Sequence, residues 1–267
     1  MSIVRQPAVK AGSYTATSTE LIVSVAARAL AGKRRVFAGV GLPTLAVDLA
    51  QRTVNPDVEL VYESGVCAAH PTSMPESIGD AVIVAGAEAV LSMQALFGYV
   101  LQGGHIDVGF LGAAQIDRFG SLNTSFIGDA RSPRVRLPGA GGAPEIMMNA
   151  AEVFVIMRRH DLGSFPEDLD FCTSPSPVRG RESGLGLPHR GMGVSTVITP
   201  LGTLQRPTAY SELELVSVHE GVTVDEVRAA TGWDLKVADG VHVTMPPSDE
   251  SIRLLREEID TVRLYLR

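Results

Sequence analysis

The strongest candidate for covalent chemistry is Glu63, which follows the mostly apolar residues 58–62 (VELVY) and precedes Ser64 and Gly65. We predict that residues 58–62 form a strand and that the carboxylate lies at its carboxyl end. A carboxylate is ionised at neutral pH, so it can act as a nucleophile without a partnering base. The small residues after it would leave the backbone open to a bulky substrate. The alternative, which the pattern also permits, is a surface carboxylate beside a turn.

Three further segments rich in small residues are candidates for backbone contacts with a ligand. Two of them follow predicted strands, at 36–38 and 106–111, and the third follows Pro138. The residues concerned are Gly39 and Gly41, then Gly112 and Ala113, then Gly139, Gly141, Gly142 and Ala143. In residues 39–41 and 139–143, the backbone N–H groups could face an anion or an oxyanion. A tight connection between two elements is the alternative. Residues 139–143 match neither a nucleotide P-loop nor the dinucleotide fingerprint.

Other reactive side chains give weaker signals. Neither His70 nor His105 has a second ligand at metal spacing, so we expect ordinary loop histidines and no metal site. Cys67 has no basic neighbour to lower its pKa, which favours a buried structural thiol. Cys67 and Cys172 are in no metal or redox spacing, so we expect two reduced thiols in a cytoplasmic protein, with a structural disulfide as the alternative.

The elements that would position these residues alternate between strand and helix. Thr17 and Glu20 form a capping box that predicts a helix with Ile22, Val25, Ala26, Ala29 and Leu30 on one face. Further strands are predicted at 36–38, 58–62, 106–111 and 153–157, and a helical stretch at about 88–102. This alternation predicts an α/β fold, an open and mostly parallel sheet with helices on both faces. Because ligands bind beyond the carboxyl ends of such strands, the turns at 39–41, 63–65 and 112–114 should converge.

The last third of the chain has a different character. Residues 172–188 are rich in Pro, Gly, Ser and Arg, which predicts a long surface loop; Arg179 and Arg181 in it could meet phosphates or be simply solvated. Residues 194–199 and 203–205 predict a hairpin. Thr223 and Ser248 should each cap a helix. We expect one domain over residues 1–267, with a smaller C-terminal elaboration from about residue 199.

Composition excludes several classes of protein. Of the 267 residues, 45% are hydrophobic and 20% charged, which is typical of a globular protein. The net charge is −7 and no basic stripe is present, so we expect no nucleic-acid partner. No stretch reaches the roughly 18 apolar residues that span a bilayer, and the N-terminal residues lack the apolar run of a signal peptide.

Four motifs occur in order along the chain: GVGLP at 39–43, ESG at 63–65, IDVGFLGAAQID at 106–117 and PGAGGA at 138–143. Together they resemble the β subunit of class I coenzyme A transferases, in the variant of the glutaconate CoA-transferase type. Residues 123–129, 172–175 and 181–188 extend the similarity. The resemblance therefore covers most of the chain, and the ordered set is specific where a single motif would be weak.

The resemblance implies an open α/β subunit that pairs with an α subunit of similar fold, commonly as an α2β2 heterotetramer. It implies that CoA passes from an acyl-CoA to a carboxylic acid through a thioester on Glu63, with CoA as a substrate and no permanently bound cofactor. Residues 139–143 would lie near the acyl and CoA groups, with Gly112 and Ala113 close by. Exposed apolar surface is expected near the glycine turns. The alternatives are an acyl-CoA hydrolase (ring-opening or thioester) or decarboxylase on the same fold, or a non-catalytic subunit.

Overall fold

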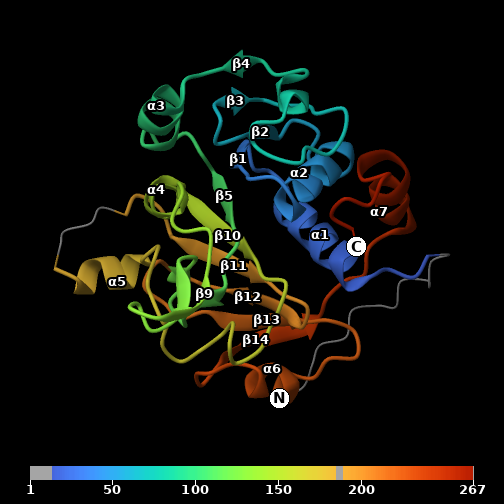
Figure 1. The fold of residues 1–267 in the computed structure, drawn as a ribbon. Helices are drawn as coiled ribbons and strands as arrows, with labels where there is room; N and C mark the ends of the chain where they lie inside the picture. The colour runs from blue at the N-terminus through green and yellow to red at the C-terminus, as the bar shows by residue number, and fades with distance from the viewer. Residues whose placement is uncertain (1–13, 185–188, 267) are drawn as a thin grey trace. The chain divides into compact units, whose positions relative to one another are not determined.

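The computed structural model describes residues 14–184 and 189–266, which divide into two compact units. We call residues 14–110 together with 246–266 the N-terminal unit, and the described residues of 111–245 the central unit. The prediction of one domain with an elaboration from about residue 199 stays a prediction. Each unit is built around strands and helices of its own (Figure 1).

Helix α1, Ser18–Ala29, opens the N-terminal unit at the predicted capping box. The Thr17 hydroxyl accepts the Glu20 N–H at 3.2 Å, and the Glu20 carboxylate accepts the Thr17 N–H at 2.7 Å. The predicted face was partly wrong, because Val25 and Ala29 are only half-buried. The side chains that are buried instead are Val23 and Ala27, which share a face with Ile22 and Ala26 of the same helix. This helix contacts α2, Leu42–Arg52.

The sheet of the N-terminal unit has the strand order β5-β1-β2-β3-β4. The parallel pairs join β1, Arg35–Phe37, to β2, Glu59–Val61, and to β5, Val108–Leu111. All three strands lie within or overlap the predicted ranges. Antiparallel pairing then adds β3, Val66–Cys67, and β4, Ala89–Val90.

The predicted helix at 88–102 is wrong in its first third. Residues 89–90 form β4, because the Glu88 N–H donates to the Cys67 carbonyl at 3.1 Å and the Leu91 N–H to the Gly65 carbonyl at 2.9 Å. Helical structure begins only after Ser92, whose hydroxyl accepts the Ala95 N–H. It comprises α3, Met93–Ala95, and the π-helical η2, Leu96–Leu101. A short 3₁₀ helix, η1, spans Ala81–Val84 before β4.

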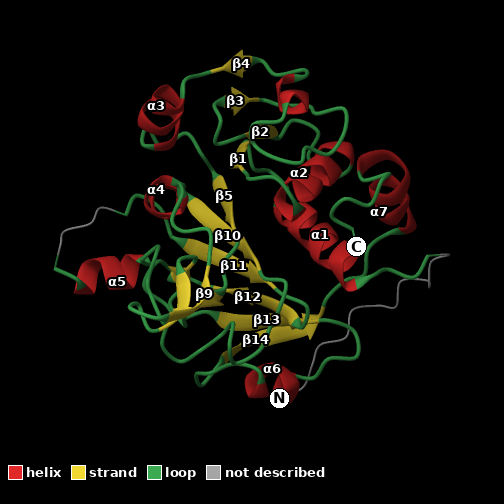
Figure 2. Cartoon of the chain, in the orientation of Figure 1, coloured by secondary structure: helices red, strands yellow, loops and turns green. Residues whose placement is uncertain are grey.

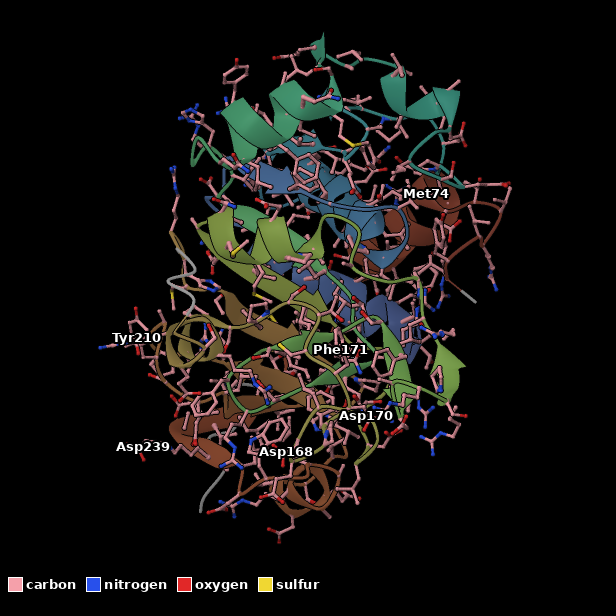
Figure 3. All side chains as sticks on the ribbon, turned by 60° about the vertical axis from the view of Figure 1, so that its left-hand side comes forward. Met74, Asp168, Asp170, Phe171, Tyr210 and Asp239 are labelled. Carbon is pink, nitrogen blue, oxygen red and sulfur yellow. The ribbon has the colours of Figure 1, made fainter. Side chains whose placement is uncertain are left out.

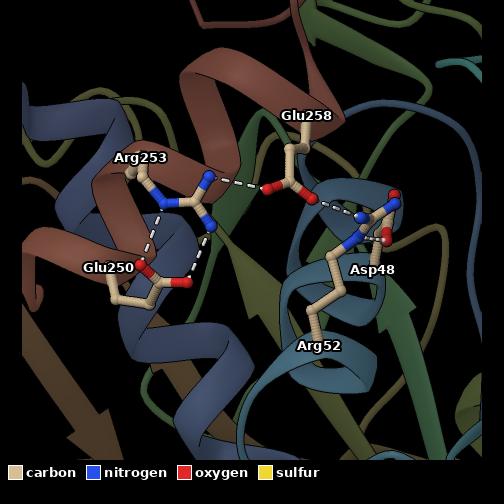
Figure 4. A network of polar contacts seen from close by, with 5 residues as sticks. All are labelled: Asp48, Arg52, Glu250, Arg253 and Glu258. Carbon is tan, nitrogen blue, oxygen red and sulfur yellow. Dashed lines mark hydrogen bonds and ion pairs between the residues drawn. The ribbon is translucent and has the colours of Figure 1, made fainter.

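The chain returns to the N-terminal unit after residue 245. Ser248 caps α7, Asp249–Leu254, as predicted, and the π-helical η3, Leu255–Ile259, continues it. The predicted apolar residues Ile252, Leu255 and Ile259 are buried. Figure 4 shows the charged network by which this segment contacts α2: Glu258 pairs with Arg52 at 3.0 Å and with Arg253 at 2.7 Å.

The central unit contains a second run of five strands, in the order β14-β13-β12-β11-β10. The strands are β10, Glu152–Ile156; β11, Val194–Ile198; β12, Gly202–Gln205; β13, Glu214–Val218; and β14, Lys236–Val243. The pairs β10–β11 and β13–β14 are parallel, and the predicted hairpin β11–β12 is antiparallel. Helix α6, Val224–Ala229, begins at the predicted Thr223 cap, and α4, Ala143–Asn149, follows the glycine segment.

Four short strands of the central unit had no clear sequence signal. They form two small antiparallel sheets, β6 with β7 and β8 with β9. Their bounds are Gln115–Ile116, Leu122–Asn123, Phe126–Gly128 and Pro133–Arg136.

The predicted surface loop at 172–188 is wrong over its middle. Residues 177–182 form helix α5, Pro177–Glu182 (Figure 2). The Ser176 hydroxyl accepts the Arg179 N–H at 3.3 Å, and Pro177 occupies the first helical position, where its missing N–H costs nothing. A serine–proline start is a helix signal that the high Gly and Pro content of the stretch obscured. Residues 185–188 lie outside the described part of the chain.

These pairings confirm the predicted α/β class, in which the central strands of an open sheet are parallel. Within residues 14–184 and 189–266, no helix has both the length and the apolar character needed to cross a membrane.

Candidate active site

Glu63 lies in a tight turn directly after β2. The Gly65 N–H donates to the Tyr62 carbonyl at 2.9 Å, and the Tyr62 N–H donates to the Val66 carbonyl at 2.9 Å. Glu63 and Ser64 therefore occupy the two corner positions of the turn. Glu63 is half-buried, and within the described residues its carboxylate has no hydrogen-bond or ion-pair partner. The strand-end position predicted for it is correct.

Gly65 is required by the geometry of this turn. Its φ is +102°, and a Cβ at this position would lie 2.0 Å from the Leu91 carbonyl oxygen. The Gly65 carbonyl in turn accepts the Leu91 N–H, so the turn is fixed to the segment that follows β4. The Ser64 hydroxyl oxygen is buried and has no hydrogen-bond partner among the described residues. A buried polar atom without a partner is unusual in a folded protein.

A buried pair of hydroxyls connects the end of β2 with the glycine turn after β1. The Thr44 hydroxyl donates to the Gly39 carbonyl at 3.0 Å and lies 3.4 Å from the Tyr62 hydroxyl. Tyr62 is fully buried, and this burial raises its pKa to about 12, so the hydroxyl stays protonated. Because β1 and β2 pair in parallel, the turns that follow them lie at the same end of the sheet. That Glu63 and the Gly39–Gly41 turn act at one site stays a prediction. Neither Thr44 nor Tyr62 was identified from the sequence.

The glycine segment 139–143 lies in the central unit. The Gly139 N–H donates to the Thr124 carbonyl at 2.9 Å, and the Ala143 N–H to the Ala140 carbonyl at 3.0 Å. The N–H groups of Gly141 and Gly142 donate to no group in the described part of the chain. Gly141 has φ +49° and Gly142 has φ −83°, the alternation that turns successive N–H groups to one side.

The glycines at 139 and 141 are needed for backbone conformation rather than for close packing. Both have positive φ, and a Cβ on either would meet no atom within 4 Å. Open space therefore lies beside Gly139 and Gly141. Gly112, in the same unit, follows β5, and a Cβ there would lie 4.0 Å from the Ile156 carbonyl at the end of β10. Ala113 is the next residue.

The predicted site residues thus fall into two groups. Glu63, Gly39 and Gly41 belong to the N-terminal unit, and Gly112, Ala113 and residues 139–143 to the central unit. Within the N-terminal unit, the three residues lie in the turns that follow two paired parallel strands, β1 and β2. The meeting of all four segments at one site stays a prediction.

The remaining candidates have structural explanations. Arg179 donates to the buried Asp117 carboxylate at 3.1 Å, and the Arg181 guanidinium lies 5.7 Å from the ring centroid of Tyr210, which points outward in Figure 3. Both cysteines are free thiols, and burial raises the pKa of each. Over the described ranges, no group of three or more His, Cys, Asp or Glu side chains is placed to hold a metal ion.

A cavity of about 690 Å³ in the central unit contains none of the predicted site residues. It is lined by Asp117, Arg118, Phe119, Glu167, Asp168, Cys172, Pro175, Arg179, Glu182 and Ser183. Four of these are carboxylates and two are arginines, one of them already paired with Asp117. This lining does not favour a polyanionic ligand such as CoA.

Comparison with known proteins gives a consistent result. Residues 19–230 match the sequence profile of the family described as Coenzyme A transferase. The chain is 43% identical over 242 residues to the B subunit of 3-oxoadipate CoA-transferase from Pseudomonas knackmussii, covering 90% of this chain and 92% of the relative. It is 30% identical over 258 residues to the B subunit of glutaconate CoA-transferase from Acidaminococcus fermentans, covering 94% and 95%.

The fold agrees with the sequence comparison. The crystal structure of glutaconate coenzyme A-transferase from Acidaminococcus fermentans matches with a TM-score of 0.85 at 28% identity, over 95% of this chain and 98% of the other. The resemblance inferred from the four ordered motifs is confirmed. The chain belongs to the coenzyme A transferase family.

Proposed function

We propose that this chain is one of the two subunits of a coenzyme A transferase and that it moves CoA between an acyl-CoA and a carboxylic acid through a covalent adduct on Glu63. The observation that carries the proposal is the turn at the end of β2. There a half-buried carboxylate, without a partner among the described residues, lies in a turn that is bonded to Leu91 after β4, in a chain of this family. We further propose that the protein works in the cytoplasm, in keeping with its two free thiols.

In the proposed reaction, a Glu63 carboxylate oxygen attacks the thioester carbonyl of the donor. The C–S bond breaks, leaving a mixed anhydride and CoA thiolate. The thiolate attacks the Glu63 carbonyl carbon of the anhydride and displaces the donor carboxylate, so CoA is held as a thioester on Glu63. The acceptor carboxylate attacks this thioester and releases the thiolate, which then attacks the acceptor's acyl carbon. New acyl-CoA and the free Glu63 carboxylate are the products.

Each of these steps passes through a tetrahedral oxyanion. The N–H groups of Gly141 and Gly142 donate to no acceptor among the described residues and are suited to stabilise it. The loss of one such donor typically lowers a rate by roughly 10²–10³. Backbone donors need no side chain near the bulky thioester.

The proposal includes an α subunit that completes the site, as in an α2β2 heterotetramer. Both relatives described above are named as B subunits, which supports a partner chain for this protein as well. Val90, Met93 and Tyr99 are 61%, 51% and 78% exposed. They flank Leu91, whose N–H donates to the Gly65 carbonyl of the Glu63 turn. Residues 81–104 contain a single charged residue, Glu88. Exposed apolar and aromatic side chains with few charges are typical of the core of a protein interface.

The test is to trap the adduct. The complex of this chain with its α subunit, incubated with an acyl-CoA and no acceptor acid, should accumulate a thioester on Glu63. Borohydride reduces this thioester to an alcohol, and peptide mass spectrometry then locates it. The chain alone should show little or no CoA exchange.

Substitution of Glu63 gives the matched variants. Glu63→Gln keeps the shape and removes the anionic nucleophile, so exchange should fall by several orders of magnitude while acyl-CoA still binds. Glu63→Asp withdraws the carboxylate, and a misplacement of about 1 Å can lower the rate ~10²-fold. A hydrolase would instead release CoA without an acceptor and accumulate no adduct. Near-normal exchange by Glu63→Gln, with deamidation excluded by mass, would end the proposal.

A further inference from the structure

Residues 260–266, which we call the C-terminal turn, are organised around one buried carboxylate. Asp260 is fully buried. One of its oxygens accepts the Leu264 N–H at 2.7 Å, and the other accepts the N–H groups of Tyr265 and Leu266, each at 2.9 Å. A buried carboxylate requires such donors, so its hydrogen bonds fix the path of the backbone. The position of the Tyr265 side chain is thereby set.

Tyr265 contacts two segments of the N-terminal unit. Its hydroxyl donates to the Pro75 carbonyl at 2.6 Å. Its ring carbon Cε1 lies 4.0 Å from the point that a Cβ on Gly41 would occupy, which is an ordinary packing distance for a side chain above a glycine. Burial and the nearby carboxylates of Glu76, Asp260 and Asp80 raise the pKa of Tyr265, so it remains a hydrogen-bond donor at neutral pH.

Gly41 is the N-cap residue directly before helix α2, and no side-chain hydrogen bond caps this helix end. Its φ of +109° favours glycine, so the turn cannot be stiffened by a side chain of its own. The Thr44 hydroxyl holds the turn from within, through the Gly39 carbonyl. Tyr265 covers Gly41 itself. The same C-terminal segment also contacts the far end of α2 through the ion pair between Glu258 and Arg52 (Figure 4).

Building on the proposed function, we propose that Tyr265 is a positioning residue for CoA transfer. It fixes the Gly39–Gly41 turn, beside Glu63, in the conformation that receives the acyl-CoA. Tyr265 acts through Gly41 and Pro75 and does not touch the reacting atoms. A substitution at Tyr265 would therefore change the fit of the acyl-CoA without removing a chemical group from the reaction.

The test compares Tyr265→Leu and Tyr265→Phe with the wild type, in the complete complex. Tyr265→Leu removes the hydrogen bond and the ring, so the KM for acyl-CoA should rise on the order of tenfold. Tyr265→Phe keeps the ring and should give a smaller rise. A purely structural role would lower the apparent kcat in proportion to the folded protein lost and leave KM unchanged. Amide hydrogen exchange over residues 39–46 should become faster in Tyr265→Leu, and less so in Tyr265→Phe.

Arg256→Met is the matched control in the same segment. Arg256 pairs with the buried Glu20 of α1 at 2.6 Å, so its loss loosens the segment without touching Gly41. For Arg256→Met we expect the KM for acyl-CoA and the rate of amide hydrogen exchange over residues 39–46 to stay at the wild-type values. Equal changes in Arg256→Met and Tyr265→Leu, or no change in any Tyr265 variant, would overturn the inference.

Two further results keep the inference separate from the proposed function. A wild-type complex that transfers no CoA would refute the proposed function. Amide hydrogen exchange over residues 39–46 would then decide by itself whether Tyr265 fixes the Gly39–Gly41 turn. If Tyr265→Leu does not fold, Tyr265→Phe decides, since it loses a single hydrogen bond: faster exchange over 39–46 supports the inference and unchanged exchange overturns it.

Discussion

At the scale of single residues, glycines perform two different tasks in this chain. Gly65 is required by close packing, because a Cβ there would collide with the Leu91 carbonyl. Gly139 and Gly141 have open space around them and are required by positive φ alone. A substitution at Gly65 therefore disrupts the fold. A side chain at Gly139 or Gly141 would strain the backbone, whereas Gly142, at φ −83°, has a conformation open to other residues.

Gly142 provides the sharpest test of the glycine segment. Its φ of −83° accommodates an ordinary residue, so Gly142→Val should lower the free energy of unfolding by only about 1 kcal/mol, the difference between a good and a poor N-cap. The CoA-transfer rate should fall by roughly 10²-fold, because a branched side chain would intrude beside the N–H donors. Thermal melting and transfer kinetics per folded molecule measure the two effects. An early-melting variant whose folded fraction works normally would mean that the segment is only a turn.

Some residues of the candidate site could be predicted from the sequence and others could not. Glu63 was identified because a carboxylate followed by Ser-Gly stands at the end of a predicted strand and matches a family motif. Thr44 and Tyr62 were missed because their contact joins residues 18 apart, and Tyr265 because its contact with Pro75 joins residues 190 apart. A single sequence shows local patterns such as caps and strand ends. It carries no direct record of which distant residues meet.

At the scale of elements, the same distinction holds. The capping boxes at Thr17 and Thr223 are local chemistry, and both helices begin where the sequence predicts. Strand β4 was assigned to a helix because alanine and valine at 89–90 fit a helical pattern, while pairing with β3 decides the outcome. At residues 89–90, hydrogen bonding to β3 therefore outweighs the local preference for a helix.

The surface formed by Val90, Met93 and Tyr99 gives a prediction about the partner. Each residue is more than half exposed in the free chain, so Met93→Asp and Tyr99→Asp should change its stability by no more than about 0.5 kcal/mol. Affinity for the α subunit should fall by about tenfold or more, because a charge would be buried without a partner. Titration calorimetry with the co-purifying α subunit measures this loss. Val262→Asp, at an 80% exposed apolar position of the same unit, is the control. Equal binding by all three variants would exclude this surface.

At the scale of the whole chain, the family resemblance was more informative than any single element. Motifs spread from residue 39 to residue 188 were matched in order, and the family profile covers residues 19–230. The return of residues 246–266 to the N-terminal unit had no sequence signal, because the capping serine at 248 predicts a helix and not its neighbours. The charged contacts of Glu258 and Arg256 with α2 and α1 secure this return.

Stability of the chain should depend on pH through His160 of the central unit. The ring is buried, bonded to the hydroxyls of Thr199 at 2.9 Å and Thr231 at 3.1 Å, and stacked on Phe165. Burial lowers its pKa from 6.5 to about 4, against a smaller opposing effect of Asp161. Between these pH values the folded chain therefore binds fewer protons at His160 than the unfolded chain does. The contribution of the neutral His160 to the free energy of unfolding is fully present above pH 6.5 and is lost as the pH falls toward 4.

The expected loss between pH 7.5 and pH 5 is about 2 kcal/mol from this one group, since each unit of pKa difference corresponds to about 1.4 kcal/mol. Urea unfolding at the two pH values measures it. His160→Gln retains hydrogen-bonding capacity without titrating, so its free energy of unfolding should fall correspondingly less over this range. His105→Gln, at an exposed loop position, controls for the substitution itself. If His160→Gln and the wild type lose the same free energy between pH 7.5 and pH 5, acid sensitivity must come from other groups.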